Sequence, residues 1–221
     1  MATSREIEAG QAVYTPFTLG AYDLFVLGFS NRLLWRCPTS NLRDLYRRNA
    51  GAAHLDIGVG TGYFLDRTQW PVPDPKIALV DLNRHSLDAA AARIARFRPR
   101  TVVANCLEPL AVEGRFDSVG LNYLLHCLPG AIPDKSVVFD HVRPLLAEGG
   151  VVFGSTILQG DAPRSAAARA LMNFYNARGI FSNARDTLAD LEAALRARFA
   201  AVTLRRIGAV ALFEARKPLT G

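Results

Sequence analysis

Short apolar runs alternate with segments of helical length and composition through the middle of this chain. The runs have the length of buried strands and cover residues 54–59, 76–82, 101–106, 116–125 and 149–158. The helical segments between them are 61–70, 85–97 and 133–146. This alternation predicts an α/β fold in which helices cover both faces of a parallel sheet and the crossovers are right-handed.

The pattern changes after the fifth run. Two amphipathic helices are expected at 163–178 and 185–199, followed by two strands at 201–207 and 209–217. Because only Gly208 separates these strands, they are predicted to form an antiparallel pair at one edge of the sheet. A chain of 221 residues, half of them apolar, is long enough to bury one core. It has no linker-like stretch, so we expect a single domain.

The first fifty residues differ from the rest of the chain. Aromatic side chains are spread there over helix-like segments near residues 20–35 and 40–49. We expect residues 1–50 to form a helical cap over a core of residues 51–221, with an insertion at about 156–185 that builds part of a pocket. An aromatic lid suits a small organic ligand. Ordinary packing of these helices on the sheet is the alternative.

Charge and composition exclude several classes of protein. The formal charge of +6 comes from 23 Arg, 3 Lys and 20 acidic residues, and the cations form no basic cluster interleaved with aromatic residues. We therefore expect no nucleic-acid partner. No apolar run approaches the roughly 18 residues of a membrane helix, and residues 1–10 lack the apolar core of a secretory signal, which predicts a cytoplasmic protein. Cys37, Cys106 and Cys127 form no C-x-x-C pair, which argues against a disulfide framework or a zinc site.

A glycine-rich turn follows the first expected strand. It contains Gly58, Gly60 and Gly62, and Asp81 ends the second strand. Sheets of this class bind nucleotides at that place, where the acid accepts hydrogen bonds from ribose hydroxyls. Asp56 puts a negative charge near the turn, which disfavours a pyrophosphate and suits a cationic ligand. Position 63 is Tyr rather than the third glycine of the dinucleotide pattern, so S-adenosylmethionine is favoured over a nicotinamide dinucleotide.

Five ordered stretches resemble the class I S-adenosylmethionine-dependent methyltransferases over roughly residues 53–217. They are HLDIGVGTGYFL, the strand ending in Asp81, VVANCLEPL, FDSVGLNYLLHCLP and RPLLAEGGVVF. The fourth is similar to the L-H-H-L-P pattern of the small-molecule branch that includes ubiquinone and menaquinone methyltransferases, with Cys127 in place of the second His. The resemblance implies a Rossmann-like sheet of seven strands, mostly parallel with one antiparallel strand. It also implies S-adenosylmethionine as cofactor and S-adenosylhomocysteine as product.

The resemblance further implies a cofactor site across the ends of strands one, two and four. There the glycines would approach the methionine part of the cofactor and Asp81 would hold the ribose. The backbone near Cys106 would meet adenine, and Asn122 would line the sulfonium side. The full set expected at the cofactor is Asp56, Gly58, Gly60, Gly62, Asp81, Leu82, Asn105, Cys106, Leu107 and Asn122.

The acceptor is expected near His126, which follows the fourth strand. Its neutral imidazole could take the proton of an acceptor hydroxyl or amine, or the side chain could only orient a loop or pack beside the cofactor. The residues expected around a small heteroaromatic or phenolic acceptor are Tyr14, Tyr22, Trp35, Phe174 and Tyr175. No cluster of metal-ligand residue types is visible, so no metal is expected.

The sequence therefore predicts a methyltransferase that acts on a small organic metabolite of specialised metabolism. Two alternatives stay open at this point: an NAD(P)-dependent oxidoreductase, and a non-catalytic subunit of the same fold that binds the cofactor and activates a partner. Asp56 and the absence of a Tyr-x-x-x-Lys relay disfavour the first. The intact glycine turn and Asp81 argue that cofactor binding is retained. The sequence indicates no oligomeric state.

Overall fold

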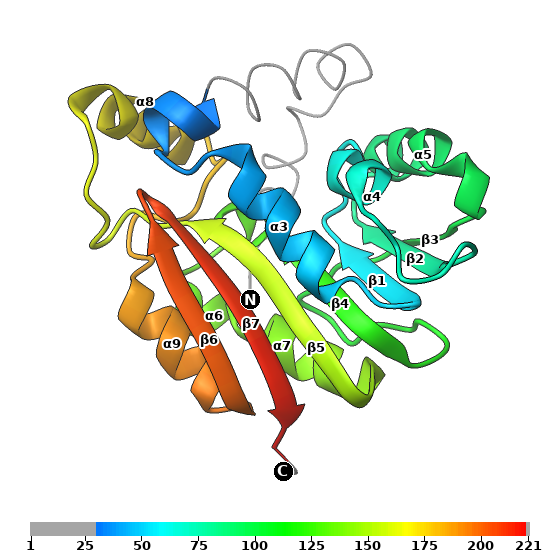
Figure 1. Cartoon of the computed structure of the whole chain (residues 1–221). Coiled ribbons are helices and arrows are strands. Elements are labelled where there is room, and N and C mark those ends of the chain that lie inside the picture. Colours follow the sequence, from blue (N-terminus) through cyan, green and yellow to red (C-terminus); the bar gives the residue numbers. More distant parts are fainter. Residues whose placement is uncertain (1–29, 220–221) are drawn as a thin grey trace.

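The chain folds around a seven-stranded sheet with the order β3-β2-β1-β4-β5-β7-β6 (Figure 1). The structure is a computed structural model, and it describes residues 30–219. The strands are β1 (Ala53–Ile57), β2 (Lys76–Asp81), β3 (Arg100–Val103), β4 (Phe116–Asn122), β5 (Leu146–Ile157), β6 (Phe199–Ile207) and β7 (Val210–Pro218). They lie close to the seven runs predicted from the sequence, which confirms the α/β fold class.

All strands but one run in the same direction. β1 pairs in parallel with β2 and β4, β2 with β3, and β4 with β5. β7 runs antiparallel to both β5 and β6, and Gly208 turns the chain between β6 and β7 with a φ of +58°. The predicted terminal hairpin is therefore confirmed. Parallel pairing brings the carboxyl ends of β1, β2 and β4 to one edge, where open α/β sheets form their ligand sites.

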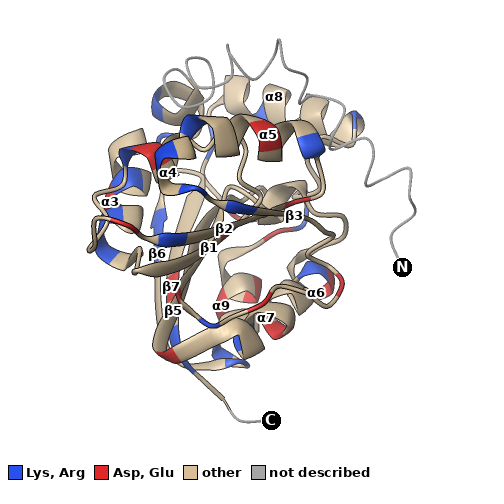
Figure 2. Cartoon of the chain, turned by 90° about the vertical axis from the view of Figure 1, so that its right-hand side faces the viewer, with Lys and Arg blue, Asp and Glu red and all other residues tan. Residues whose placement is uncertain are grey.

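Helices cover both faces of the sheet (Figure 2). One face carries α3 (Thr39–Asn49), α4 (Tyr63–Arg67) and α5 (Arg84–Arg93), and the other carries α6 (Ile132–Lys135), α7 (Val137–Val142) and α9 (Leu188–Arg196). α8 (Ala166–Ala177) lies beyond the carboxyl end of β5 (Figure 1). Short 3-10 turns are η2 (Ala95–Phe97), η3 (Leu125–Cys127) and η4 (Arg143–Leu145). Over residues 30–219, no helix combines the length and the apolar character needed to cross a membrane.

The α-helices that follow β1 are shorter than the sequence predicts, and two of the predicted segments show the physical reason. The segment 61–70 forms only α4, which ends at Arg67 where the backbone becomes extended. The segment 133–146 divides into α6, α7 and η4, and Pro144 lies in the last of these. Proline lacks a backbone N–H and so favours the end of a helix over its interior. β5 consequently begins at Leu146, three residues before the predicted start, and its pairing with β4 shifts register there.

A buried ion pair joins α6 to the loop before α9. Lys135 Nζ donates to Asp186 Oδ2 at 2.9 Å and to the Ser182 carbonyl at 2.7 Å, and both charged side chains are fully buried. Burial lowers the pKa of Lys135 and raises the pKa of Asp186, because desolvation disfavours each charged form. The attraction between the two groups opposes both shifts. The ion pair therefore holds the loop against α6, and each charged group is stable in the interior only because the other one is present.

We expect Lys135→Met to lower the free energy of unfolding by about 3 to 5 kcal/mol, because it leaves the Asp186 carboxylate buried and unpaired. Urea denaturation followed by circular dichroism measures this change. Lys135→Met combined with Asp186→Asn should recover part of the loss, since the buried charge is gone. Lys76→Met, at an exposed lysine, is the control and should change stability by less than about 0.5 kcal/mol. If Lys135→Met lowered the free energy of unfolding no more than this control, the stabilising role of the buried ion pair would be contradicted.

Candidate active site

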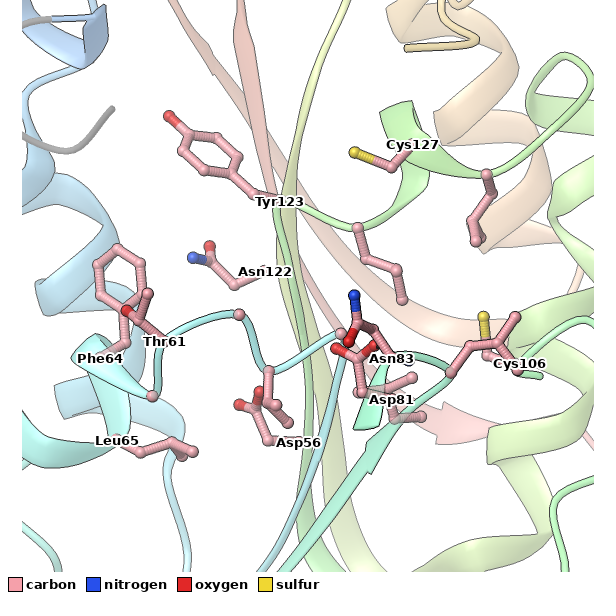
Figure 3. A pocket seen from close by; sticks show the side chains of 18 of the residues that line it. Asp56, Thr61, Phe64, Leu65, Asp81, Asn83, Cys106, Asn122, Tyr123 and Cys127 are labelled. Carbon is pink, nitrogen blue, oxygen red and sulfur yellow. The ribbon is translucent and has the colours of Figure 1, made fainter. Parts of the chain in front are cut away.

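A cavity opens at the carboxyl ends of β1, β2 and β4 (Figure 3). The structure brings to its lining all the residues expected at the cofactor: Asp56, Gly58, Gly60, Gly62, Asp81, Leu82, Asn105, Cys106, Leu107 and Asn122. Lining residues that the sequence did not single out include Tyr46, Thr61, Asn83, Tyr123 and Leu124. For Thr61, Asn83 and Tyr123 the only signal was adjacency to an expected residue. Tyr46 belongs to the aromatic residues of the expected N-terminal cap, but nothing in the sequence indicated its contact with Asp56.

The glycine loop brings its backbone close to the cavity. Gly60 has a φ of +53°, and no atom lies within 4 Å of the place where its Cβ would be, so this face of the loop is open. Gly62, with a φ of +71°, is packed instead, because a Cβ would lie 2.9 Å from the Cα of Ala90 on α5. A positive φ is free of strain only for glycine, and at position 62 only glycine also leaves room for Ala90. Arg93 of α5 also donates to Thr61 Oγ1 at 3.0 Å, which ties the loop to that helix.

Asp56 lies at the end of β1 with only 2% of its surface exposed. Its Oδ2 accepts a hydrogen bond from the Tyr46 hydroxyl at 2.7 Å and lies 3.2 Å from His54 Nε2. His54 Nδ1 lies 2.7 Å from Ser118 Oγ, which accepts from the Gly51 N–H. The Ser118 hydroxyl hydrogen can therefore donate to Nδ1, leaving Nε2–H to donate to Asp56. This network ties β1 to β4 and α3.

Asp81 ends β2 and lies at the cavity (Figure 3). Its carboxylate accepts a hydrogen bond from the Asn83 N–H at 2.8 Å. Burial raises the pKa of Asp81 to about 6, and the charge of Asp56 adds to the rise, while backbone N–H groups of Asn83, Val59 and Gly60 oppose it. A ligand that donates hydrogen bonds to this carboxylate would stabilise its ionised form. Ribose hydroxyls are donors of that kind.

Charge at the cavity is negative. The lining contains the carboxylates of Asp56 and Asp81 and, in the described part of the chain, no Lys or Arg. Such a site suits a ligand with positive groups and disfavours a pyrophosphate. S-adenosylmethionine fits this charge, because its sulfonium and ammonium are positive. Beyond Asp81, Cys106 and Leu107 form an uncharged part of the lining.

Known proteins resemble this chain along nearly its whole length. Residues 55–152 match a family model described as a methyltransferase domain. Demethylluteothin O-methyltransferase of Streptomyces thioluteus is 45% identical over 212 residues, which cover 96% of this chain and 92% of that protein. The physcion biosynthesis cluster O-methyltransferase of Aspergillus chevalieri is 40% identical over 214 residues, which cover 96% of each. The chain belongs to the class I S-adenosylmethionine-dependent methyltransferases.

Solved structures of methyltransferases share the fold. The DhpI complex with S-adenosylhomocysteine has a TM-score of 0.66 at 15% identity and covers 97% of this chain and 98% of that one. The N-methyltransferase NodS of Bradyrhizobium japonicum, also with S-adenosylhomocysteine, has a TM-score of 0.58 at 15% identity and covers 82% and 85%. Since the chain belongs to the S-adenosylmethionine-dependent methyltransferases, its cofactor is S-adenosylmethionine, and the oxidoreductase alternative is excluded. Among residues 30–219, no three His, Cys, Asp or Glu side chains are grouped to hold a metal ion.

The end of β4 contributes the side chains that lie across the cavity from Asp81. Asn122 Oδ1 accepts a hydrogen bond from Ser155 Oγ on β5, which fixes the orientation of the amide. Tyr123 follows with its ring at the cavity, and Cys127 lies near it (Figure 3). Burial raises the pKa of the Cys127 thiol to about 12, so the thiol stays neutral. This end of the cavity is uncharged.

His126 is buried and lies outside the lining that the described residues form. Its Nδ1 accepts a hydrogen bond from the Ile157 N–H at 3.4 Å, and its ring packs against Phe181 with centroids 4.5 Å apart. Burial lowers the pKa of His126 to about 3, and the nearby charge of Lys135 adds to the effect. An imidazole with so low a pKa is a weak base. These surroundings argue against the general-base prediction and favour the alternative in which the side chain packs and orients.

Of the five aromatic residues expected around the acceptor, the structure describes three, Trp35, Phe174 and Tyr175, and these do not line the cavity. Trp35 is 1% exposed and packs against Phe181, with ring centroids 6.2 Å apart. Tyr175 packs on Phe181 as well, at 4.9 Å, and Phe174 is 48% exposed to solvent on α8. For Trp35 and Tyr175, burial of apolar surface between the segment before α3 and the loop after α8 decides the position. The remaining two, Tyr14 and Tyr22, lie outside the described residues.

We expect Asp81→Asn to weaken binding of S-adenosylhomocysteine at about pH 8 by roughly tenfold or more, because charge-assisted hydrogen bonds to the ribose are lost. Calorimetric titration measures the affinity. In the unsubstituted enzyme the affinity should fall by about tenfold per pH unit below the Asp81 pKa of about 6, because protonation removes the acceptor charge.

Asp81→Asn should lack this pH dependence, because it has no carboxylate to protonate. Asp88→Asn, at an exposed carboxylate on α5, is the matched control and should retain the affinity and the pH profile of the unsubstituted enzyme. If Asp81→Asn showed that same affinity and profile, the ribose assignment would be wrong.

Proposed function

We propose that this enzyme methylates a hydroxyl oxygen of a small, uncharged phenolic or heteroaromatic compound of specialised metabolism. The observation that carries the proposal is the uncharged wall opposite Asp81, formed by Asn122, Tyr123, Leu124, Cys127, Leu128 and Pro129. A flat apolar compound with few polar groups suits such a wall. Two relatives that are at least 40% identical over nearly their whole length are named O-methyltransferases, which supports oxygen as the methylated atom.

Each part of the lining has one task in this proposal. The cofactor supplies a methyl group on a positive sulfonium. The open face of the glycine loop at Gly60 meets the methionine part of the cofactor. Asp81 holds the ribose, and the negative charge of Asp56 favours the positive groups of the ligand. Asn122, fixed by Ser155, lines the sulfonium side. The acceptor oxygen gains the methyl group as the sulfur–methyl bond breaks, S-adenosylhomocysteine is left, and the acceptor's proton passes to water.

In this proposal methyl transfer is accelerated by alignment of the acceptor oxygen with the methyl group rather than by a general base. The methyl group on a sulfonium is already electrophilic, so an acceptor oxygen held in line needs little further activation. The thiols at the cavity are neutral, and the imidazole of His126 is a weak base. A phenolic hydroxyl loses its proton far more readily than an alkyl hydroxyl. These surroundings therefore favour a phenolic or heteroaromatic acceptor.

We also propose a cytoplasmic enzyme whose partner is a free metabolite rather than a nucleic acid. Nucleic acids are bound chiefly through Lys and Arg contacts to phosphates. The described residues that line the cavity include neither. The charge of the site thus supports a neutral metabolite.

Incubation of the purified chain with S-adenosylmethionine and a panel of hydroxylated aromatic compounds, demethylluteothin included, tests the proposed function. Mass spectrometry should detect S-adenosylhomocysteine and an equal amount of singly methylated product, and NMR should place the new methyl group on oxygen. Analogues with hydrogen in place of the hydroxyl are the control and should give neither product. Methylation of carbon or nitrogen alone would contradict the proposal. Cofactor binding without turnover of any acceptor is the result expected of a non-catalytic subunit.

We expect His126→Asn to keep kcat/KM within about threefold of the unsubstituted enzyme, because the Asn amide oxygen can still accept from the Ile157 N–H. The acidic limb of the pH profile should keep its shape. Repeating the profile with an acceptor of different pKa separates ionisation of the enzyme from ionisation of the acceptor. A loss of about 100-fold together with disappearance of the acidic limb would restore the general-base role.

A further inference from the structure

Tyr123 has an unusual backbone conformation. Its φ is +54°, in the left-handed region that side chains other than glycine seldom adopt. Four non-glycine residues in the described chain have a positive φ, namely Arg36, Arg98, Tyr123 and Lys217, and of these Tyr123 alone lines the cavity. Its backbone N–H donates to the Ser155 carbonyl at 2.8 Å, which stabilises the strained turn after β4. Backbone strain of this kind persists where the surroundings enforce it, and it gathers at functional sites.

The side chain of Tyr123 is held at its far end as well. Its hydroxyl donates to Asn31 Oδ1 at 2.8 Å. Asn31 is fully buried, and its Nδ2 donates in turn to Thr39 Oγ1 at 3.0 Å, at the start of α3. The ring thus spans from the end of β4 to the segment before α3, and it lies beside Asn122 and Cys127 at the cavity (Figure 3). Both ends of the side chain are fixed while the ring faces the ligand space.

We propose that Tyr123 is a positioning residue for the acceptor, and that Asn31 sets its place. The inference rests on the proposed function and deepens it: the ring of Tyr123 is a fixed flat surface against which a planar aromatic acceptor packs, with its hydroxyl directed to the methyl group. Offset or edge contact between aromatic rings has a preferred geometry, so a fixed ring orients its partner. Asn31 precedes the matched methyltransferase domain. The acceptor surface therefore depends on a segment that does not belong to the sheet.

A purely structural role accounts less well for this arrangement. The Tyr123 ring packs partly on the core, with its centroid 5.6 Å from that of the His126 ring. It also lines the cavity and is only partly buried, whereas an aromatic residue with a purely structural role is stabilised by complete burial. The left-handed turn directs the side chain to the ligand space at the end of β4, next to the amide of Asn122. Strain, a hydrogen-bonded hydroxyl and a cavity-facing ring coincide in this one residue. Their joint effect is a fixed distance between the acceptor surface and the sulfonium side.

Tyr123→Phe keeps the ring and removes the hydrogen bond to Asn31, so it tests the proposal without deleting the wall. With an acceptor that the unsubstituted enzyme methylates, we expect kcat/KM to fall by about fivefold or more, while the affinity for S-adenosylhomocysteine stays within about twofold. Asn31→Ala should give a similar loss. The double variant should lose no more than the larger single loss, because both changes remove the same interaction. Asn41→Ala, at the first turn of α3 and outside the cavity, is the matched control and should keep both constants.

Amide hydrogen exchange, measured on the enzyme loaded with S-adenosylhomocysteine, is a second test of the proposal and needs no acceptor. Tyr123→Phe should raise exchange in the peptide that covers residues 30–37 and leave the glycine-loop peptide unchanged. Unchanged kcat/KM in Tyr123→Phe, or additive losses in the double variant, would overturn the proposal. So would equal weakening of cofactor affinity and turnover, which is the mark of general destabilisation. Failure of the unsubstituted enzyme to methylate any acceptor refutes the proposed function instead, while exchange still decides whether Tyr123 holds the segment before α3.

Discussion

The buried carboxylate of Asp56 fixes the relative positions of β1, β4 and α3. A carboxylate with 2% exposure is stable there only if hydrogen bonds replace the water it has lost, and Tyr46 and His54 supply them. The neighbouring position on β4 is Gly120, where a Cβ would lie 2.7 Å from Asp56 Oδ2. The glycine loop begins two residues after Asp56, with the Gly58 N–H bonded to the Val80 carbonyl. The start of the cofactor loop is thus set by a polar contact inside the sheet.

The parts of the fold that could be predicted are those determined by local sequence. Strand positions follow from short apolar runs, and the parallel order follows from their alternation with helical segments. The loop from Gly58 to Gly62 and the acid at Asp81 have fixed places relative to strand ends. Every cofactor residue expected from these patterns lies on the cavity lining. The hairpin was also visible, because only Gly208 separates the two predicted strands; in the structure the turn consists of Gly208 and Ala209.

The parts that could not be predicted depend on contacts between distant residues. Tyr46 meets Asp56 because α3 packs on the sheet, and Ser118 meets His54 because their strands pair. The spacing of these residues along the sequence therefore predicts neither contact. The positive φ of Tyr123 has no signal in residue type, because tyrosine does not favour that region. The burial of Trp35 follows from its contact with Phe181, about 150 positions away. Aromatic residues in the first fifty positions therefore indicated a cap but could not separate core packing from ligand contact.

The end of β4 links the two halves of the cavity. Gly120 lies against Asp56 of β1, Asn122 is held by Ser155 of β5, and Tyr123 is held by Asn31. Three positions at the end of β4 and directly after it are thus held by three different parts of the chain. Because interiors are close-packed, each of these contacts restricts the movement of the position that it holds. Methyl transfer by alignment needs that stiffness, since the acceptor must be held within about half an ångström of the productive geometry. The residues expected at the cofactor lie at or just after strand ends, whereas the contact that holds Tyr123 comes from outside the sheet. Change at residue 31 would alter the acceptor surface and leave the cofactor side in place.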